Sequence, residues 1–169
     1  MRISLQLILA TLIMAFLSSC APGESGGADA ASQEASKELV RRWLTGIWDN
    51  GDKELFRELA TEDYVYSYPG QEELRGDAFL DFGDSIRSAI PDFNNTIEQQ
   101  FIEGDMVVTR GTTRGTNQGA FGDIPPTGNS VEVPWVMFTR LRDGRVAEEW
   151  EIFDTLGFMT QLGAVSTPE

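Results

Sequence analysis

Hydrophobic residues recur at helical spacing in three stretches of the chain. The first stretch places its apolar residues on one side, at Leu39, Val40, Trp43, Leu44, Ile47 and Trp48. This spacing predicts an amphipathic helix, and the Asn50-Gly51 pair that follows fits its C-terminus. Asp52 then predicts the N-cap of a second helix, whose apolar side carries Leu55, Phe56 and Leu59. A third helix is expected over Phe79 to Ile90, with Pro91 ending it.

Beyond Pro91 the pattern changes to the alternation typical of β-strands. Four strands are expected after Pro91, over Thr96 to Glu103, Met106 to Thr116, Val131 to Arg142 and Val146 to Phe153. A fifth, short strand is expected before it, over Tyr64 to Tyr68. Glu103-Gly104-Asp105 and Asp143-Gly144 fit hairpin turns, which predicts antiparallel pairing. Helices followed by antiparallel strands predict an α+β domain, with a strongly curved sheet packed against helices around a cavity.

Alternation divides the last strand into two faces. One face carries Val146, Glu148, Trp150, Ile152 and Asp154, and the other carries Ala147, Glu149, Glu151 and Phe153. Asp154 ends this apolar strand, and its neighbours include Phe153, Leu156 and Phe158. Such surroundings favour a carboxyl that exchanges its proton near neutral pH. The same position fits the N-cap of a helix over residues 155–162, and both roles can hold.

The N-terminal residues carry the pattern of an exported lipoprotein. Arg2 precedes an apolar run from Leu5 to Leu17, which is short for a bilayer span but typical of a signal peptide. Leu17-Ser18-Ser19-Cys20 then resembles the bacterial lipobox, and Cys20 is the only cysteine. We therefore expect residues 1–19 to be a removed signal peptide and Cys20 to carry a membrane-anchoring lipid.

Three segments are therefore expected: the signal peptide, a lipidated and flexible linker over residues 20–34, and one domain over residues 35–165. The linker is rich in Gly, Ala, Ser and acidic residues. Localisation at the cell envelope follows from the lipid. Ala21 resembles the signal for outer-membrane sorting in Gram-negative-type cells; in other cells the lipid would lie on the exterior of the cell membrane.

Composition restricts the available chemistry. The chain has no histidine, so the commonest general base near neutral pH and the usual zinc and iron ligand sets are missing. We expect no metal and no cofactor, and any acid–base chemistry must come from Asp, Glu, Tyr or Lys. The net charge of −14 repels phosphates, so no nucleic-acid partner is expected.

Three stretches resemble the motifs of the SnoaL-like polyketide cyclases, a group also described as ester cyclases. The first is Asp63-Tyr64-Val65 followed by Pro69. The central one is Arg114-Gly115-Thr116 with Gly119 and Ile124-Pro125-Pro126-Thr127-Gly128. The closing one is Glu149-Trp150 with Asp154-Thr155-Leu156-Gly157 and Gln161-Leu162-Gly163. The resemblance covers about Ser36 to Gly163.

This resemblance implies the NTF2-like fold, a cone-shaped barrel in which N-terminal helices pack on a curved, mostly antiparallel sheet. It also implies a deep apolar pocket, a homodimer, and aldol-type ring closure of an aromatic polyketide without metal or organic cofactor. In the family an acidic residue of the closing motif acts as acid or base, and that position is Asp154 here. Family members often carry histidines at the positions of Ser67, Asn117 and Glu149, so a changed substrate, or binding alone, is possible here.

The candidate ligand contacts are Trp150, Asn117, Ser67, Tyr64, Trp135 and Met137. Asn117 and Ser67 offer neutral hydrogen-bonding groups where the family has imidazoles, although Asn117 fits a loop position better. Trp150, Trp135 and Met137 fit a pocket wall or a core equally well. At least one of the tyrosines at 64, 66 and 68 should face the cavity.

The expected function is a cofactor-independent cyclase, isomerase or lyase that acts on a small apolar or aromatic molecule through Asp154. Export to the envelope argues against a role on a polyketide assembly line, because such intermediates are made in the cytosol. Two alternatives stay open: a non-catalytic ligand-binding lipoprotein of the cell envelope, and a scaffold whose open sheet face docks another protein.

Overall fold

The structure is a computed structural model that describes residues 25–165. The expected signal peptide and the lipidated Cys20 lie outside these residues. Among the described helices, none combines the length and the apolar character needed to cross a membrane.

Two helices and a π-helical turn open the domain. Helix α1 (Ser25–Trp43) continues into η1 (Leu44–Asp49), and α2 (Lys53–Leu59) follows. Asp52 caps α2 as predicted, because its side chain accepts the backbone N–H groups of Glu54 and Leu55 at 3.1 and 2.9 Å. The start of α1 differs from the expected linker boundary at residue 34. Alanines favour a helix here, and Arg41 pairs with Glu34 at 2.8 Å.

A five-stranded sheet follows in the order β1-β5-β4-β3-β2 and does not close on itself. Its strands are β1 (Ala60–Ser67), β2 (Asn94–Glu103), β3 (Met106–Thr116), β4 (Ser130–Arg142) and β5 (Arg145–Phe153). Strand β1 pairs parallel to β5, and all other pairs are antiparallel. Helix α3 (Gly76–Ala89) connects β1 to β2, and α4 (Thr155–Gln161) follows β5. The predicted α+β class and the curved, mostly antiparallel sheet are confirmed.

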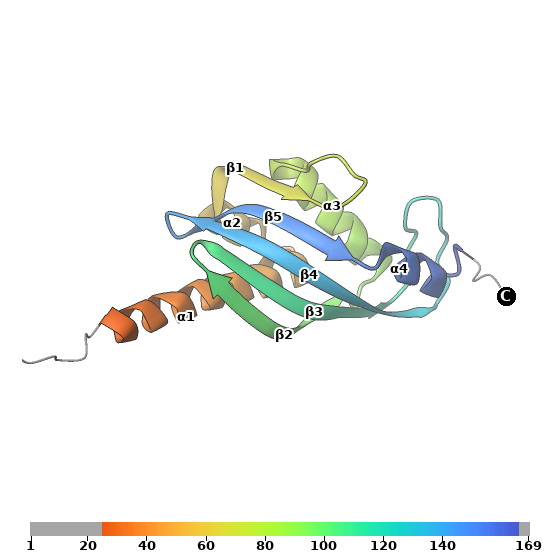
Figure 1. Cartoon of the computed structure of the whole chain (residues 1–169). Coiled ribbons are helices and arrows are strands. Elements are labelled where there is room, and N and C mark those ends of the chain that lie inside the picture. Colours follow the sequence, from red (N-terminus) through yellow and green to blue (C-terminus); the bar gives the residue numbers. More distant parts are fainter. Residues whose placement is uncertain (1–24, 166–169) are drawn as a thin grey trace, which may run out of the picture.

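The helices α1, α2 and α3 lie behind the sheet in Figure 1, and the face turned toward the viewer carries no helix. The core between the two layers is largely aromatic. Trp43 packs against Phe56, Tyr64 and Phe79 with ring centroids 5.3 to 6.4 Å apart. Aromatic rings bury large apolar areas and therefore dominate the stability of this layer contact.

A bulge in the β4–β5 hairpin decides which side chains of β5 face the helices. Leu141 pairs with Val146, but Arg140 pairs with Glu148, so Ala147 is an extra residue on β5. Val146 and Ala147 are both buried. Beyond the bulge Glu149, Glu151 and Phe153 share the concave face, whereas Glu148, Trp150 and Ile152 point outward.

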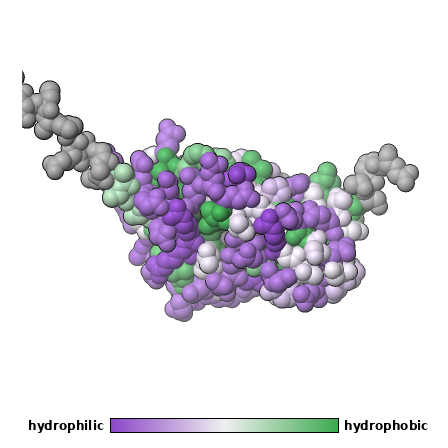
Figure 2. All heavy atoms as spheres, turned by 90° about the horizontal axis from the view of Figure 1, so that it is seen from below, coloured by the Kyte–Doolittle hydropathy of each residue, from purple (hydrophilic) through white to green (hydrophobic). Residues whose placement is uncertain are grey.

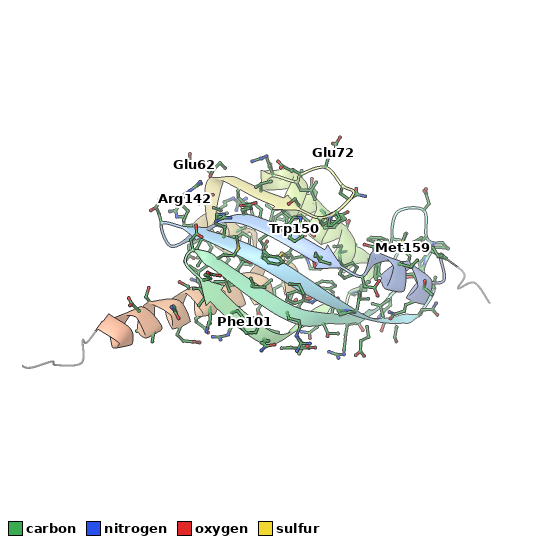
Figure 3. The ribbon with its side chains drawn as sticks, viewed as in Figure 1. Glu62, Glu72, Phe101, Arg142, Trp150 and Met159 are labelled. Carbon is green, nitrogen blue, oxygen red and sulfur yellow. The ribbon has the colours of Figure 1, made fainter. Side chains whose placement is uncertain are left out.

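The surface fits the charged composition. Seen from the lower edge of the sheet in Figure 1, the molecule is mostly hydrophilic, with small separate hydrophobic areas (Figure 2). The larger exposed hydrophobic side chains include Phe101 and Trp150, which lie on the helix-free face of the sheet (Figure 3).

Candidate active site

A cavity of about 240 Å³ lies between the concave face of the sheet, η1, α3 and α4. Strands β4 and β5 form its floor, and the segment after β1 and the loop at Phe121 close its sides. Nine of the residues that line it are aromatic, among them Trp48, Tyr66, Trp135 and Phe153. This is the apolar pocket that the sequence led us to expect.

Glu151 is the one carboxyl group that lines this cavity among the described residues. It lies two residues beyond Glu149 on β5, opposite Met137 of β4. Its Oε2 atom accepts a hydrogen bond from the hydroxyl of Tyr66 on β1. Within residues 25–165 the structure shows neither an ion pair nor a second hydrogen bond to this side chain.

Burial raises the pKa of Glu151 from its ordinary 4.5 to about 7. Removing a carboxylate from water disfavours its charged form, and this effect is the largest one here. The hydrogen bond from Tyr66 lowers the pKa, and the nearby charge of Glu149 raises it. A carboxyl with this pKa can both accept and donate a proton near neutral pH.

Glu149 lies deeper, in the core behind the cavity, and is fully buried. Its Oε2 atom accepts hydrogen bonds from Tyr64 Oη at 2.7 Å and Trp48 Nε1 at 3.3 Å. Burial also raises the pKa of Glu149 to about 7. Because the ring of Trp48 lines the cavity, Glu149 holds part of the cavity wall in place.

The parallel pairing of β1 with β5 produces two equivalent tyrosine–glutamate pairs. Tyr64 and Tyr66 are two residues apart on β1, as Glu149 and Glu151 are on β5, so all four side chains point to the same face. Tyr64 pairs with Glu149 in the core, and Tyr66 pairs with Glu151 at the cavity. One strand pairing therefore positions both carboxyl groups.

The prediction that Asp154 faces the cavity is wrong. Its side chain is exposed and accepts the backbone N–H of Gly157 at 2.9 Å, so it caps α4. It lies beside a shallow depression on the other side of the sheet, together with Arg110 and Pro134. The helix-cap role that the sequence also suggested is confirmed.

The same bulge explains the position of Trp150. This side chain is 38% exposed on the outer face and packs against Phe138 with ring centroids 5.3 Å apart. It is therefore not a wall of the cavity, contrary to the prediction. Tyr64 and Ser67 do not line the cavity either; Tyr64 binds Glu149, and the Ser67 hydroxyl donates to the Glu149 carbonyl at 3.4 Å.

Trp135 and Met137 do line the cavity, in agreement with their expected position on the inner face of β4. Asn117 does not, although it is fully buried. Its side chain donates to the carbonyls of Ala89 and Gly119 and accepts from the N–H and hydroxyl of Thr127. Asn117 therefore fixes the loop between β3 and β4 from a position outside the cavity lining.

Tyr66 and Tyr68 line the cavity, as expected of at least one of the three tyrosines, but the sequence did not single out Tyr66 or indicate Glu151. The alternation of side chains along β5 divides them into two faces, but it does not show which face points to the cavity. One available signal was the cluster Tyr64, Tyr66 and Tyr68, whose spacing matches that of Glu149 and Glu151. Residues 25–165 contain no group of three or more Cys, Asp or Glu side chains arranged to hold a metal ion.

Comparison with known proteins gives consistent results. The family model described as SnoaL-like polyketide cyclase matches residues 38–162. IdmH from Streptomyces antibioticus, named as a polyketide cyclase, is 30% identical; the match covers 76% of this chain and 98% of IdmH, with a TM-score of 0.67. A protein from Jannaschia sp. CCS1, named as a SnoaL-like polyketide cyclase, is 26% identical over 80% of this chain and 95% of its own, with a TM-score of 0.70.

A third structure, from Catenulispora acidiphila, is described as having a ketosteroid isomerase-like fold. It is 21% identical over 78% of this chain and 98% of its own, with a TM-score of 0.63, and it supports the fold alone. A search of curated proteins found no match to this chain.

Proposed function

Because this chain belongs to the SnoaL-like polyketide cyclase family, we propose that it is an acid–base enzyme of the cyclase or isomerase type that works without a cofactor. Its substrate is a small apolar molecule held in the cavity. Glu151, and not Asp154, is the acid–base group.

The observation that supports this proposal is a single carboxyl group with a raised pKa inside an aromatic cavity. Buried carboxyl groups without a counter-ion are costly for a fold and occur preferentially where proton transfer needs them. Tyr66 holds Glu151 in one orientation toward the cavity.

The proposed reaction starts at a carbon next to a C=O or C=N group. The carboxylate of Glu151 removes a proton from this carbon, and the C–H electron pair forms a C=C bond while the C=O or C=N π pair moves to the heteroatom. For a cyclase, the resulting nucleophilic carbon attacks a carbonyl carbon of the same molecule. Glu151 then returns its proton to the new alkoxide, which restores the carboxylate.

The cavity limits the size of the substrate. Its volume of about 240 Å³ lies below the ~300–1,000 Å³ usual for ligand pockets. A molecule of one or two rings fits, which separates this chain from enzymes that close the rings of long aromatic polyketides.

The test is exchange of α-protons for deuterium in a panel of one-ring and two-ring ketones and imines, followed by NMR in D₂O. We expect exchange with the protein, and a loss of about 10²- to 10⁴-fold in Glu151→Gln, the range typical of general base catalysis. Asp154→Asn and Glu148→Gln remove the same charge outside the cavity and should keep full activity. Loss of exchange in Asp154→Asn, with Glu151→Gln unaffected, would reverse our assignment. Binding of panel members without any exchange of their α-protons would mean that the protein binds ligands but does not catalyse proton transfer.

We also propose that the protein is attached to the cell envelope through a lipid on Cys20. The support is the lipobox-like Leu17-Ser18-Ser19-Cys20 sequence behind an apolar segment. Acyl chains on Cys20 would hold the domain at the membrane surface. A Cys20→Ser variant should move from the membrane fraction to the soluble fraction, and continued membrane association would refute the lipid anchor.

The third proposal is a homodimer formed through the helix-free face of the sheet. Strand register aligns Phe101, Val108, Phe138 and Trp150 in one row across four strands. The arginines on this face are paired with glutamates: Arg110 with Glu98, Arg114 with Glu132, and Arg140 with Glu148. This face is thus apolar and charge-balanced in a chain of net charge −14, so two copies can meet there without strong repulsion.

A further inference from the structure

We propose that the cavity binds an organic cation, a one-ring or two-ring apolar molecule whose positive charge lies on nitrogen. The binding itself is argued from the cavity alone, and the reaction that follows from it rests on the proposed function.

Aromatic rings surround the end of the cavity at which Glu151 lies. Tyr66 packs against Trp48 and Tyr68, with ring centroids 5.1 and 5.7 Å apart, and Phe82 stacks on both tyrosines at 6.0 and 5.9 Å. All of these residues line the cavity. The faces of aromatic rings attract cations, and the attraction is strongest where water is excluded.

Among the described residues, Glu151 has no positive partner. Neither Lys nor Arg lines the cavity in the part of the chain that the structure describes. Arg87 of α3 is turned to the carbonyls of Ile47 and Trp48 and to Asp84, at 2.6 to 3.1 Å. A bound cation would supply the missing charge, and above about pH 7 the carboxylate of Glu149 strengthens the negative field.

A neutral ketone would need hydrogen-bond donors for the oxyanion that develops on its oxygen. Several donors that line the cavity already serve the protein. Trp48 Nε1 donates to Glu149, Asn95 Nδ2 donates to Asp49 at 2.8 Å, and the Thr113 hydroxyl donates to Asn95. Trp135 Nε1 is buried without a partner in the described part of the chain, so one indole N–H stays available beside the aromatic faces and the carboxylate.

A cation also suits the proposed proton transfer. In a protonated imine, Glu151 removes a proton from the carbon next to C=N⁺, the C–H pair forms C=C, and the C=N π pair becomes the nitrogen lone pair. A cation and a carboxylate thus become a neutral enamine and a neutral carboxylic acid. An apolar environment favours this cancellation of charge, because it disfavours isolated ions. The net charge of −14 would also draw cations toward the molecule.

The experiment compares two probes of the same shape, the trimethylanilinium cation and neutral tert-butylbenzene. Binding to the full chain is followed through the methyl NMR signals of Met137 and Met159, which line the cavity, with Met106 outside it as internal reference. At pH 8 we expect the cation to bind about ten-fold more tightly than its neutral isostere, the size of effect expected of a desolvated cation–π and carboxylate contact. Binding of the cation should weaken from pH 8 to pH 6 as Glu151 takes up its proton.

Variants connect this preference to one carboxyl group. In Glu151→Gln the preference for the cation should fall strongly, because only the aromatic faces remain to attract it, while tert-butylbenzene binds as before, which also shows that the cavity is intact. Glu148→Gln, the same change on the outer face of the same strand, should keep the preference. Equal or tighter binding of tert-butylbenzene by the unmodified protein, or an unchanged preference in Glu151→Gln, would overturn the inference. The exchange assay with neutral ketones is independent of this result, so the proposed acid–base function can stand or fall separately.

Discussion

Glu149 and Glu151 lie two residues apart on β5, but the two side chains have different roles. Glu149 is fully buried and Glu151 is partly buried beside the cavity, and burial raises the pKa of each to about 7. Glu149 is enclosed by the core, where Tyr64 and Trp48 donate hydrogen bonds to its Oε2 atom. Glu151 reaches the cavity and has only Tyr66 as a partner. Glu149 therefore stabilises the fold, whereas Glu151, at the cavity, is placed to act on a ligand.

The raised pKa of Glu149 predicts a pH dependence of stability. In the unfolded chain this carboxyl loses its proton above about pH 4.5, whereas in the fold it keeps the proton up to about pH 7. The free energy of unfolding should therefore fall as pH rises from 5 to 7 and then level off. Glu149→Gln should reduce this fall by on the order of 3 kcal/mol, as the pKa difference implies.

Urea unfolding at pH 5 and pH 8 measures this effect. Glu148→Gln on the outer face is the matched control and should keep the dependence of the native sequence. A Glu149→Gln protein with an unchanged difference between the two pH values would show that Glu149 is ionised in the fold.

Two acidic residues, Glu151 near the end of β5 and Asp154 just after it, also show the limit of predicting sites from sequence. Asp154 and Glu151 both lie among apolar residues, and the resemblance to the family favoured Asp154. What separates them is the extra residue Ala147, because one inserted residue exchanges the faces of everything that follows in a strand. No local pattern in the sequence marks this bulge.

At the scale of elements, the hydrophobic pattern predicted most of the fold. The four longer strands and the caps at Asp52 and Asp154 agree with the structure because they depend on local sequence. The parallel pairing of β1 with β5 joins residues about 85 positions apart, as in the bond from Tyr64 to Glu149. Local periodicity contains no information on such a pairing, so the site built on it could not be found.

The loop between β3 and β4 depends on one buried amide. Asn117 makes four side-chain hydrogen bonds there, and the loop supplies Phe121 to the cavity. Asn117→Ala should lower the free energy of unfolding by about 2–3 kcal/mol, because it leaves buried partners unsatisfied. It should also weaken ligand binding as Phe121 becomes less well fixed.

Asn129→Ala is the control for this loop. Its exposed side chain makes one hydrogen bond to the Gln161 carbonyl at 3.1 Å, so its loss should cost less than about 1 kcal/mol. Thermal unfolding of both variants is the measurement. Equal stability of the two variants would contradict the structural role of Asn117.

At the scale of the whole molecule, the charge-balanced sheet face predicts self-association. Ile152 is 48% exposed on this face, and Leu156, which belongs to α4 and not to the sheet, is 67% exposed. A stable interface buries about 800 Å² per partner, which makes a central glutamate costly. Sedimentation should show a dimer for the native sequence and for Leu156→Glu, and a monomer for Ile152→Glu.

A native protein that stays monomeric at about 100 μM, or an Ile152→Glu protein that still dimerises, would exclude this interface; the micromolar range is where weak specific interfaces associate. The cavity lies on the other face of the sheet, so loss of the dimer should leave ligand binding intact.

The central claim is that the fold keeps the carboxyl of Glu151 out of water beside an apolar cavity. The most direct test is titration of its side-chain carboxyl carbon by ¹³C NMR, with the signal assigned through Glu151→Gln. We predict a midpoint of about 7. A midpoint near 4.5, the ordinary value for a glutamate in water, would contradict the account.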